Sequence, residues 1–180
     1  RTPLQAALEV LKERHSRAAA LCRKVEMSFI ELRGAVHLYW AEKGLTADDM
    51  ATLAMILRTS GLPRLKRLSL FGNGIGDAGV QALLEGMVPG AAPSLRDLFI
   101  SNTKIGLVGA EALAAALHRG AMPNLEMLHL IGNPIGNQAM TALAAPLRKL
   151  PALRTLFLGS CNIGDEGVAS LVDNLGKDDF

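Results

Sequence analysis

Three residue types that cooperate in hydrolytic enzymes fall close together in this sequence, at Asp97, His129 and Ser101. If their segments are neighbouring parallel strands, Asp97 and Ser101 are diagonal neighbours of His129, about 7–8 Å away between Cβ atoms. That separation is too large for a hydrogen-bonded relay, and Phe99 stands between Asp97 and Ser101. An open sheet also offers no oxyanion donors, because its amides are engaged in the strand ladder. We therefore predict no catalytic residues and no enzyme.

A second motif, Gly74-Ile-Gly76-Asp-Ala-Gly79, has the spacing of a dinucleotide-binding turn and lies between an expected strand and an expected helix. The same glycine positions recur along the chain. They are Gly76, Gly106, Gly136 and Gly164 at one position and Gly79, Gly109 and Gly167 at another. A pattern present in every unit indicates a turn requirement rather than one ligand site. The sequence thus predicts no cofactor.

The two cysteines, Cys22 and Cys161, are too few for a disulfide scaffold, and no Cys/His spacing is typical of a metal site. Cys22 falls on an apolar helix face, and Cys161 occupies a turn position that asparagine holds elsewhere. The chain also has no Asn-x-Ser/Thr glycosylation site. These features favour an intracellular, reducing compartment, with the cytoplasm preferred over an organelle.

The dominant feature of the sequence is an internal repeat spaced by 30, 30 and 28 residues. Its copies run over residues 65–76, 95–106, 125–136 and 153–164, and a weaker copy lies at 35–45. Each copy is followed by apolar residues at i, i+3, i+4 and i+7, such as Val80, Leu83, Leu84 and Met87, which predict one buried helix face. A proline two residues before each following strand resets the chain toward extended backbone. Each unit is therefore a strand, a turn, a helix and a loop, and the units must stack to bury their apolar faces.

The repeated L-x-x-L-x-L-x-x-N/C-x-L pattern, with Asn73, Asn133 and Cys161 at the turn, resembles leucine-rich repeats of the ribonuclease-inhibitor-like class. Thr103 and Lys43 depart from it at the asparagine position. The resemblance implies an α/β fold: a leucine-rich-repeat solenoid, or horseshoe, with a parallel concave sheet and convex helices. About five repeats of 28–30 residues are expected over residues 35–180. The resemblance also implies that the turn residue points inward and that the horseshoe binds other proteins.

Residues 1–34 do not repeat, and we expect them to form an N-terminal helical cap. Apolar and small residues follow alternating spacings of three and four along this segment. The expected seam consists of Leu4, Leu8, Leu11, His15, Ala18, Cys22, Val25, Phe29 and Leu32. A coiled coil is the alternative, but a histidine, small residues and a cysteine make a poor seam for one. A cap is favoured because the ends of a solenoid need covering.

If the central leucines of each strand face the core, the alternate positions form columns on the concave sheet. Four of the seven aromatic residues of the chain fall in these columns, and exposed aromatic clusters are typical of protein interfaces. The predicted partner-binding residues are Tyr39, Arg67, Ser69, Phe71, Asp97, Phe99, Met127, His129, Ile131 and Phe157. The ring of Phe99 is expected to face solvent before a partner binds.

These features predict a noncatalytic protein-binding module, acting alone or as a subunit of a larger assembly. The formal net charge of +2 gives no pull toward nucleic acid, and no apolar stretch is long enough to span a membrane. Two alternatives stay open. One is a GTPase-activating protein of the leucine-rich-repeat type, using Lys43 or Lys104 beyond the strand ends. The other is a purely structural subunit that fills a gap in a complex, which the sequence does not distinguish from the binding module. The apolar edge at the C-terminal end, around Leu171 and Leu175, is expected either to be covered by a partner or to mark a fragment.

Overall fold

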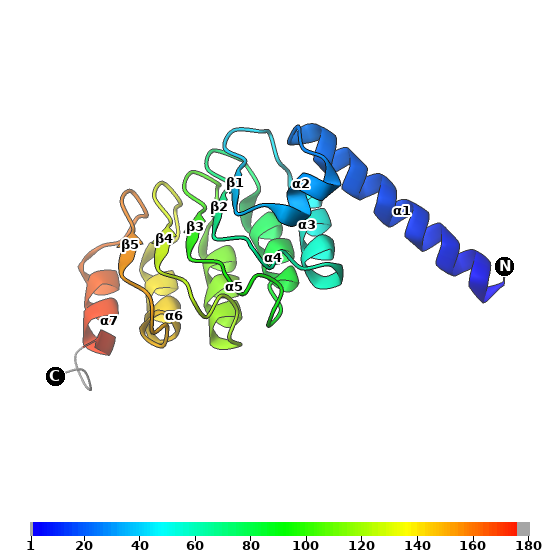
Figure 1. The fold of residues 1–180 in the computed structure, drawn as a ribbon. Helices are drawn as coiled ribbons and strands as arrows, with labels where there is room; N and C mark the ends of the chain where they lie inside the picture. Colours follow the sequence, from blue (N-terminus) through cyan, green and yellow to red (C-terminus); the bar gives the residue numbers. More distant parts are fainter. Residues whose placement is uncertain (1, 176–180) are drawn as a thin grey trace.

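The computed structural model describes residues 2–175, in which helices and strands alternate along one solenoid (Figure 1). The helices are α1 (Pro3–Lys24), α2 (Phe29–Gly34), α3 (Ala47–Thr59), α4 (Gly76–Gly86), α5 (Leu107–His118), α6 (Gly136–Arg148) and α7 (Asp165–Leu175). The strands are β1 (His37–Tyr39), β2 (Arg67–Ser69), β3 (Asp97–Phe99), β4 (Met127–His129) and β5 (Thr155–Phe157). This α/β arrangement is the predicted leucine-rich-repeat solenoid.

The five strands form one parallel sheet in chain order, β1-β2-β3-β4-β5. Helices α3 to α7 line up on the other side, so the strands form one surface and the helices the opposite one (Figure 1). The register pairs Leu68 with Leu98 and Leu98 with Leu128, which confirms the alignment predicted from the repeat. All three leucines are at most 1 % exposed, because each central strand position points into the core between sheet and helices.

The core thins at the C-terminal end of the described solenoid. In β5, Leu156 is only half-buried, whereas the equivalent Leu128 in β4 is fully buried. On α7, Val168 and Val172 are exposed. Of the apolar edge predicted around Leu171 and Leu175, Leu171 packs partly against the core, and the side chain of Leu175 lies outside the described residues.

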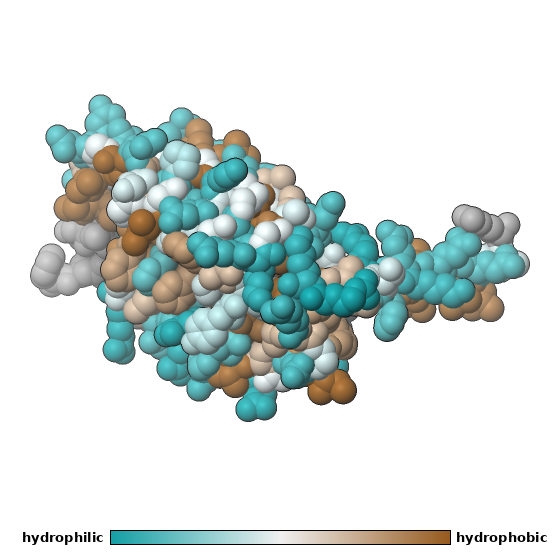
Figure 2. Space-filling view, turned by 90° about the horizontal axis from the view of Figure 1, so that it is seen from above, coloured by the Kyte–Doolittle hydropathy of each residue, from teal (hydrophilic) through white to brown (hydrophobic). Residues whose placement is uncertain are grey.

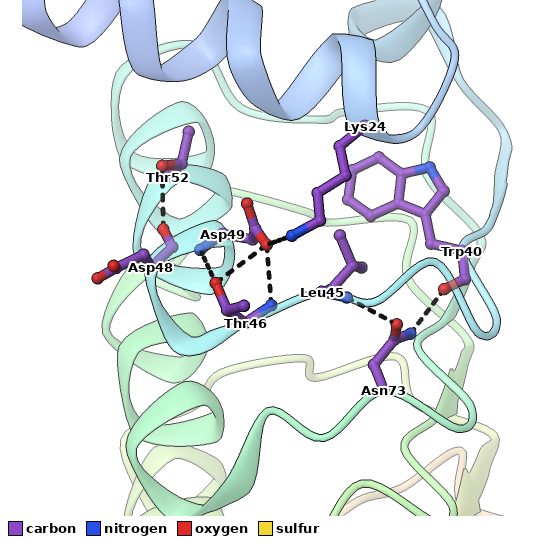
Figure 3. Close-up of polar contacts among 8 residues, drawn as sticks. All are labelled: Lys24, Trp40, Leu45, Thr46, Asp48, Asp49, Thr52 and Asn73. Atoms are coloured by element: carbon purple, nitrogen blue, oxygen red, sulfur yellow. Dashed lines mark hydrogen bonds and ion pairs between the residues drawn. The ribbon is translucent and has the colours of Figure 1, made fainter.

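A buried asparagine closes the turn after β2 and the turn after β4, and Figure 3 shows the first of them, Asn73. Asn73 is fully buried; its Oδ1 accepts a 2.9 Å hydrogen bond from the Leu45 N–H, and its Nδ2 donates to the carbonyl of Trp40 at 2.7 Å. Asn133 bonds the preceding repeat in the same way, accepting from Ile105 N–H at 3.0 Å. Each asparagine thereby satisfies turn groups that water cannot reach.

Cys161 occupies the same inward position, and its thiol donates to the carbonyl of Leu130 at 3.1 Å. Burial raises the pKa of this thiol, so the reactive thiolate is disfavoured. Cys22 is also a free, buried cysteine whose pKa is raised by burial. Both cysteines therefore have the structural positions that their place in the sequence predicts.

Glycine is required at two positions of the G-x-G-x-x-G motif for different structural reasons. Gly76 begins α4 with a φ of +63°, a left-handed conformation that glycine adopts without strain. Gly79 lies so close to Ile75 that an added Cβ would be 2.6 Å from the Ile75 Cβ. The equivalent Gly109 would bring a Cβ to 2.6 Å from Asp77 Oδ1. These close approaches within and between repeats account for the recurrence of the motif.

The N-terminal segment differs from the single capping seam predicted for residues 1–34. It forms two helices, α1 and α2, separated by a turn in which Glu26 has a φ of +57°. Of the predicted seam, only Cys22, Val25 and Leu32 are buried, whereas Phe29 is 42 % exposed. The first half of α1 extends away from the solenoid (Figure 1). The reason is length: α1 has 22 residues, whereas α3, on which it packs, has 13.

An ion pair fixes the C-terminal end of α1 to the first repeat (Figure 3). Lys24 Nζ lies 2.6 Å from Asp49 Oδ2, and Asp49 also accepts from the backbone N–H of Thr46 at 2.8 Å. Thr46 caps α3 in return, since its side chain accepts from the Asp49 N–H. Burial alone raises the pKa of Asp49, but the hydrogen bonds from Lys24 and Thr46 outweigh it and hold that pKa below its usual value.

Candidate protein-binding surface on the concave sheet

The predicted concave columns are formed by the outer residues of the five short strands. One column pairs His37, Arg67, Asp97, Met127 and Thr155, and the next pairs Tyr39, Ser69, Phe99, His129 and Phe157. Because the strands are three residues long with a core leucine at the centre, the two flanking side chains both lie on the open face of the sheet. The structure thus brings the predicted residues of β1 to β5 onto one surface.

Rings on this surface stack across neighbouring strands. The Phe99 and His129 rings are 4.0 Å apart between centroids with planes inclined by 23°, and the His129 and Phe157 rings are 4.1 Å apart and inclined by 28°. The guanidinium carbon of Arg67 lies 5.3 Å from the centroid of the Phe99 ring, within the range of a cation–π contact. Arg67, Phe99, His129 and Phe157 therefore form one continuous stack, called here the ring ladder.

Arg67 is held in the ring ladder by Asp97 on the adjacent strand. Its Nε and Nη2 atoms donate to Asp97 Oδ2 at 2.9 and 2.6 Å. Both side chains are partly exposed, so solvent screening limits what the pair adds to stability. Its structural effect is to fix the guanidinium plane beside Phe99 before any partner arrives.

His129 lies between two phenylalanine rings, and that position governs its charge. Burial between the rings lowers the pKa of His129; the nearby Asp97 carboxylate opposes this shift and Arg67 adds to it. The imidazole is therefore neutral at pH 7. Among the described residues, its buried Nε2 has no hydrogen-bond partner.

The three residue types of a hydrolytic triad are not connected here. The Asp97 carboxylate accepts from Arg67, and the His129 Nε2 has no partner in the described part of the chain. Ser101 is 6 % exposed rather than open on the concave face, and its hydroxyl is likewise without a partner among the described residues. No acid–histidine–serine relay forms from these side chains.

Around the ring ladder lies a rim of more exposed apolar side chains. Phe71 and Ile131 are 38 % and 36 % exposed, and Phe157, at the end of the ladder, is 39 % exposed. Tyr39 is 60 % exposed but contacts His37, with Ser69 separating it from Phe99 in the column. Its side chain also interacts with Arg67, so Tyr39 joins the central apolar patch at the Arg67 end of the ladder.

One expectation for this surface needs correction. The ring of Phe99 does not face solvent freely, because it is half-buried between Arg67 and His129. Ser69 and Met127 are half-buried as well. Strand neighbours about 4.8 Å apart bring flat rings into stacking contact, and the stack shields its own interior.

A second hollow lies outside the predicted site. It is a groove of about 660 Å³ between α1, α2 and α3, with Leu11, Cys22, Phe29 and Met55 among its lining residues. The sequence carried a signal for it, because Leu4, Leu8 and Leu11 continue an apolar face that no repeat unit covers. The described residues contain no group of three or more metal-ligating side chains, and none of their helices is long and apolar enough to cross a membrane.

Comparison with known proteins agrees with the repeat architecture. Three segments, residues 62–84, 91–114 and 149–172, match the family model for the Leucine Rich repeat. A search of curated proteins found no match. The matched segments run from the entry of one strand to the helix that follows it, as in the units described above. Together with the five-stranded parallel sheet, they support a leucine-rich-repeat protein, a class that serves as protein-interaction modules.

Proposed function

We propose that the chain is a noncatalytic binding module that holds a protein partner on the patch formed by the ring ladder and its rim. The observation that carries this proposal is the stack of Phe99, His129 and Phe157, whose geometry is complete before binding. Aromatic residues dominate the energy of protein interfaces, and a preformed stack loses little side-chain freedom on association. Open sheet faces are ordinarily polar, so an apolar centre on this face favours a partner.

The proposed partner presents an apolar centre with polar groups around it. Phe71, Ile131 and Phe157 supply the exposed apolar contacts, while the partly exposed Arg67–Asp97 pair supplies polar ones. We also propose that the repeats are of the ribonuclease-inhibitor-like class, which their length and the Asn73, Asn133 and Cys161 turns support.

A GTPase-activating role has weaker support. Of the two lysines beyond the strand ends, Lys43 is engaged, with its Nζ 2.8 Å from Glu26 Oε2. Lys104 is exposed, but its side chain lies over the turn at Gly74. A purely structural subunit would use the same concave contacts within a permanent assembly, so it differs from the proposal in the lifetime of the complex rather than in the surface.

Site-specific photo-crosslinking tests the proposal. A photoreactive phenylalanine replaces Phe157 in one sample and the exposed Glu111 on α5 in a matched control, and both proteins are irradiated in extract of the cells that make the chain. We expect one partner protein to be captured reproducibly at position 157 and not at position 111. Mass spectrometry should locate the crosslink on the concave face. Capture at 111 alone would move binding to the helix side and contradict the proposal.

A further inference from the structure

The N-terminal half of α1 exposes an apolar stripe that the solenoid leaves uncovered. Leu4, Leu8 and Leu11 are 79 %, 50 % and 60 % exposed. Their spacing of four and three residues puts them on one face of the helix. Figure 2 shows hydrophobic residues along one edge of the projecting helix and hydrophilic residues along the other. Capping by Thr2 and Gln5 completes the first turn of α1, so the stripe is held on a formed helix.

The stripe runs into the groove between α1, α2 and α3. Leu11 belongs to both, and the groove continues past His15 and Ala18 to Cys22. Its other walls are Phe29 on α2 and Met55 on α3. From Leu4 to Cys22 the combined surface spans 19 residues, and the 18 steps between them cover about 27 Å at the rise of an α-helix. An elongated occupant fits it better than a small molecule does.

The free charges of the groove are positive. Arg14 and Arg23 line it, and at 100° per residue they fall on opposite sides of the apolar stripe. Within the described part of the chain neither arginine forms an ion pair. Glu26, the acid in the groove lining, is bound to Lys43 at 2.8 Å. An occupant therefore meets an apolar floor flanked by an unpaired cation on each side.

We propose that this groove binds an amphipathic helix of a partner protein whose apolar stripe is flanked by acidic residues. Helices commonly bind apolar grooves through residues at i, i+3, i+4 and i+7, and carboxylates beside that stripe would face Arg14 and Arg23. A second copy of α1 is disfavoured as the occupant. Its Glu9 and Glu13 lie on the face opposite its apolar stripe, so its own arginines, rather than its acids, would face Arg14 and Arg23 of the groove. The site shares no residue with the concave patch, so it is independent of the function proposed above.

Two synthetic peptides test the proposal with the full chain. Both are labelled 18-residue helices with leucine at i, i+3, i+4 and i+7; one carries glutamate beside the stripe and the other lysine. Fluorescence anisotropy should show the glutamate peptide binding at least tenfold more tightly than the lysine peptide. Leu8→Asp should weaken binding of the glutamate peptide at least tenfold, with the melting temperature unchanged because Leu8 is exposed. Equal affinities for the two peptides, or no binding of the glutamate peptide at 1 mM, would overturn the proposal.

A charge swap distinguishes a specific groove from general attraction. The double variant Arg14→Glu with Arg23→Glu should reverse the preference and bind the lysine peptide more tightly. The matched control, Arg64→Glu with Arg119→Glu, makes the same charge change at exposed positions outside the groove and should keep the preference for glutamate. A control that reverses like the groove variant would contradict the proposal.

Two further measurements test other occupants. Sedimentation of the protein alone should show a monomer; a dimer that Leu8→Asp dissociates would make a second copy the occupant. In co-sedimentation with phosphatidylserine vesicles, we expect the wild-type protein and the Leu8→Asp variant to behave alike, with no vesicle binding that depends on Leu8. Such binding would make an anionic membrane the occupant and overturn the proposal.

Discussion

The repeat body and the N-terminal segment bury their apolar residues in opposite ways. In the body, Leu68, Leu98 and Leu128 each have an equivalent residue on the next strand, and all three are at most 1 % exposed. In α1, a face of similar spacing is buried only where the helix meets α3. The comparison shows that periodicity identifies an apolar face, whereas burial depends on whether a neighbouring element extends alongside it.

The largest effect that tests this difference between the repeat body and α1 is expected in the free energy of unfolding. Leu128→Ala is expected to lower it by about 2–5 kcal/mol, because the side chain is fully buried with repeat neighbours on both sides. Leu8→Ala, the same change on the exposed stripe, should leave it within about 0.5 kcal/mol. Urea denaturation of both variants measures the difference. Similar losses would show that α1 is as tightly packed as the repeats.

A second change sharpens the contrast between burial and function. Phe157→Ala should weaken partner binding by about 2 kcal/mol, roughly thirty-fold, because the ring ends the ladder and contributes to the exposed rim. Glu111→Ala, on α5, serves as the control and should leave the affinity unchanged. Titration calorimetry with the partner captured by crosslinking gives both values, and a weaker Glu111→Ala complex would place the interface on the helix side.

The attachment of α1 to the body gives a smaller effect that depends on pH. Asp49→Asn is expected to cost about 1 kcal/mol, because it weakens the cap of α3 and removes the charge paired with Lys24. Since the pKa of Asp49 is lowered in the folded state, its contribution is present above its unfolded pKa and is lost as the pH falls through the folded one. Unfolding free energies at pH 7 and pH 3 should differ less for the variant than for the wild type.

The smallest expected effect concerns the charge of His129. Its pKa is lowered in the folded state, so the unfolded chain binds the proton more readily and stability falls as the pH drops below the unfolded pKa of about 6.5. His129→Phe keeps a ring between Phe99 and Phe157 while removing the titration. Thermal unfolding at pH 5 and pH 7 should show a smaller pH difference in the variant. An unchanged difference would mean that the ring ladder does not control this protonation.

The residues that share a column on the concave sheet could be predicted from the repeat. Side-chain direction alternates along a strand, and a constant spacing aligns successive units. The inward roles of Asn73, Asn133 and Cys161 followed from the family pattern, and the structure places all three inside. Stacking of Phe99 on His129 was not anticipated, since a column specifies neighbours without specifying ring orientation. The pairing of Asp97 with Arg67 was missed for the same reason.

The course of α1 was beyond what the sequence could predict. Leu4, Leu8 and Leu11 have the same spacing as Ala18 and Cys22, so the pattern alone does not indicate where contact with α3 ends. That boundary depends on the length of α3 and on the turn at Glu26. Three-dimensional placement therefore revealed the groove, although its residues were visible in the sequence.

The bonds between repeats also set an order in which the chain can complete its turns during synthesis. Asp77 Oδ1 accepts from the N–H groups of Gly106 and Gly109 at 2.7 and 2.9 Å, so an earlier residue caps the start of α5. The turn at Ile105, by contrast, needs Asn133, which leaves the ribosome 28 residues later. The unit that contains α5 thus receives its helix cap from the unit before it and its turn acceptor from the unit after it. Its turn can be completed only after the next repeat has been synthesised.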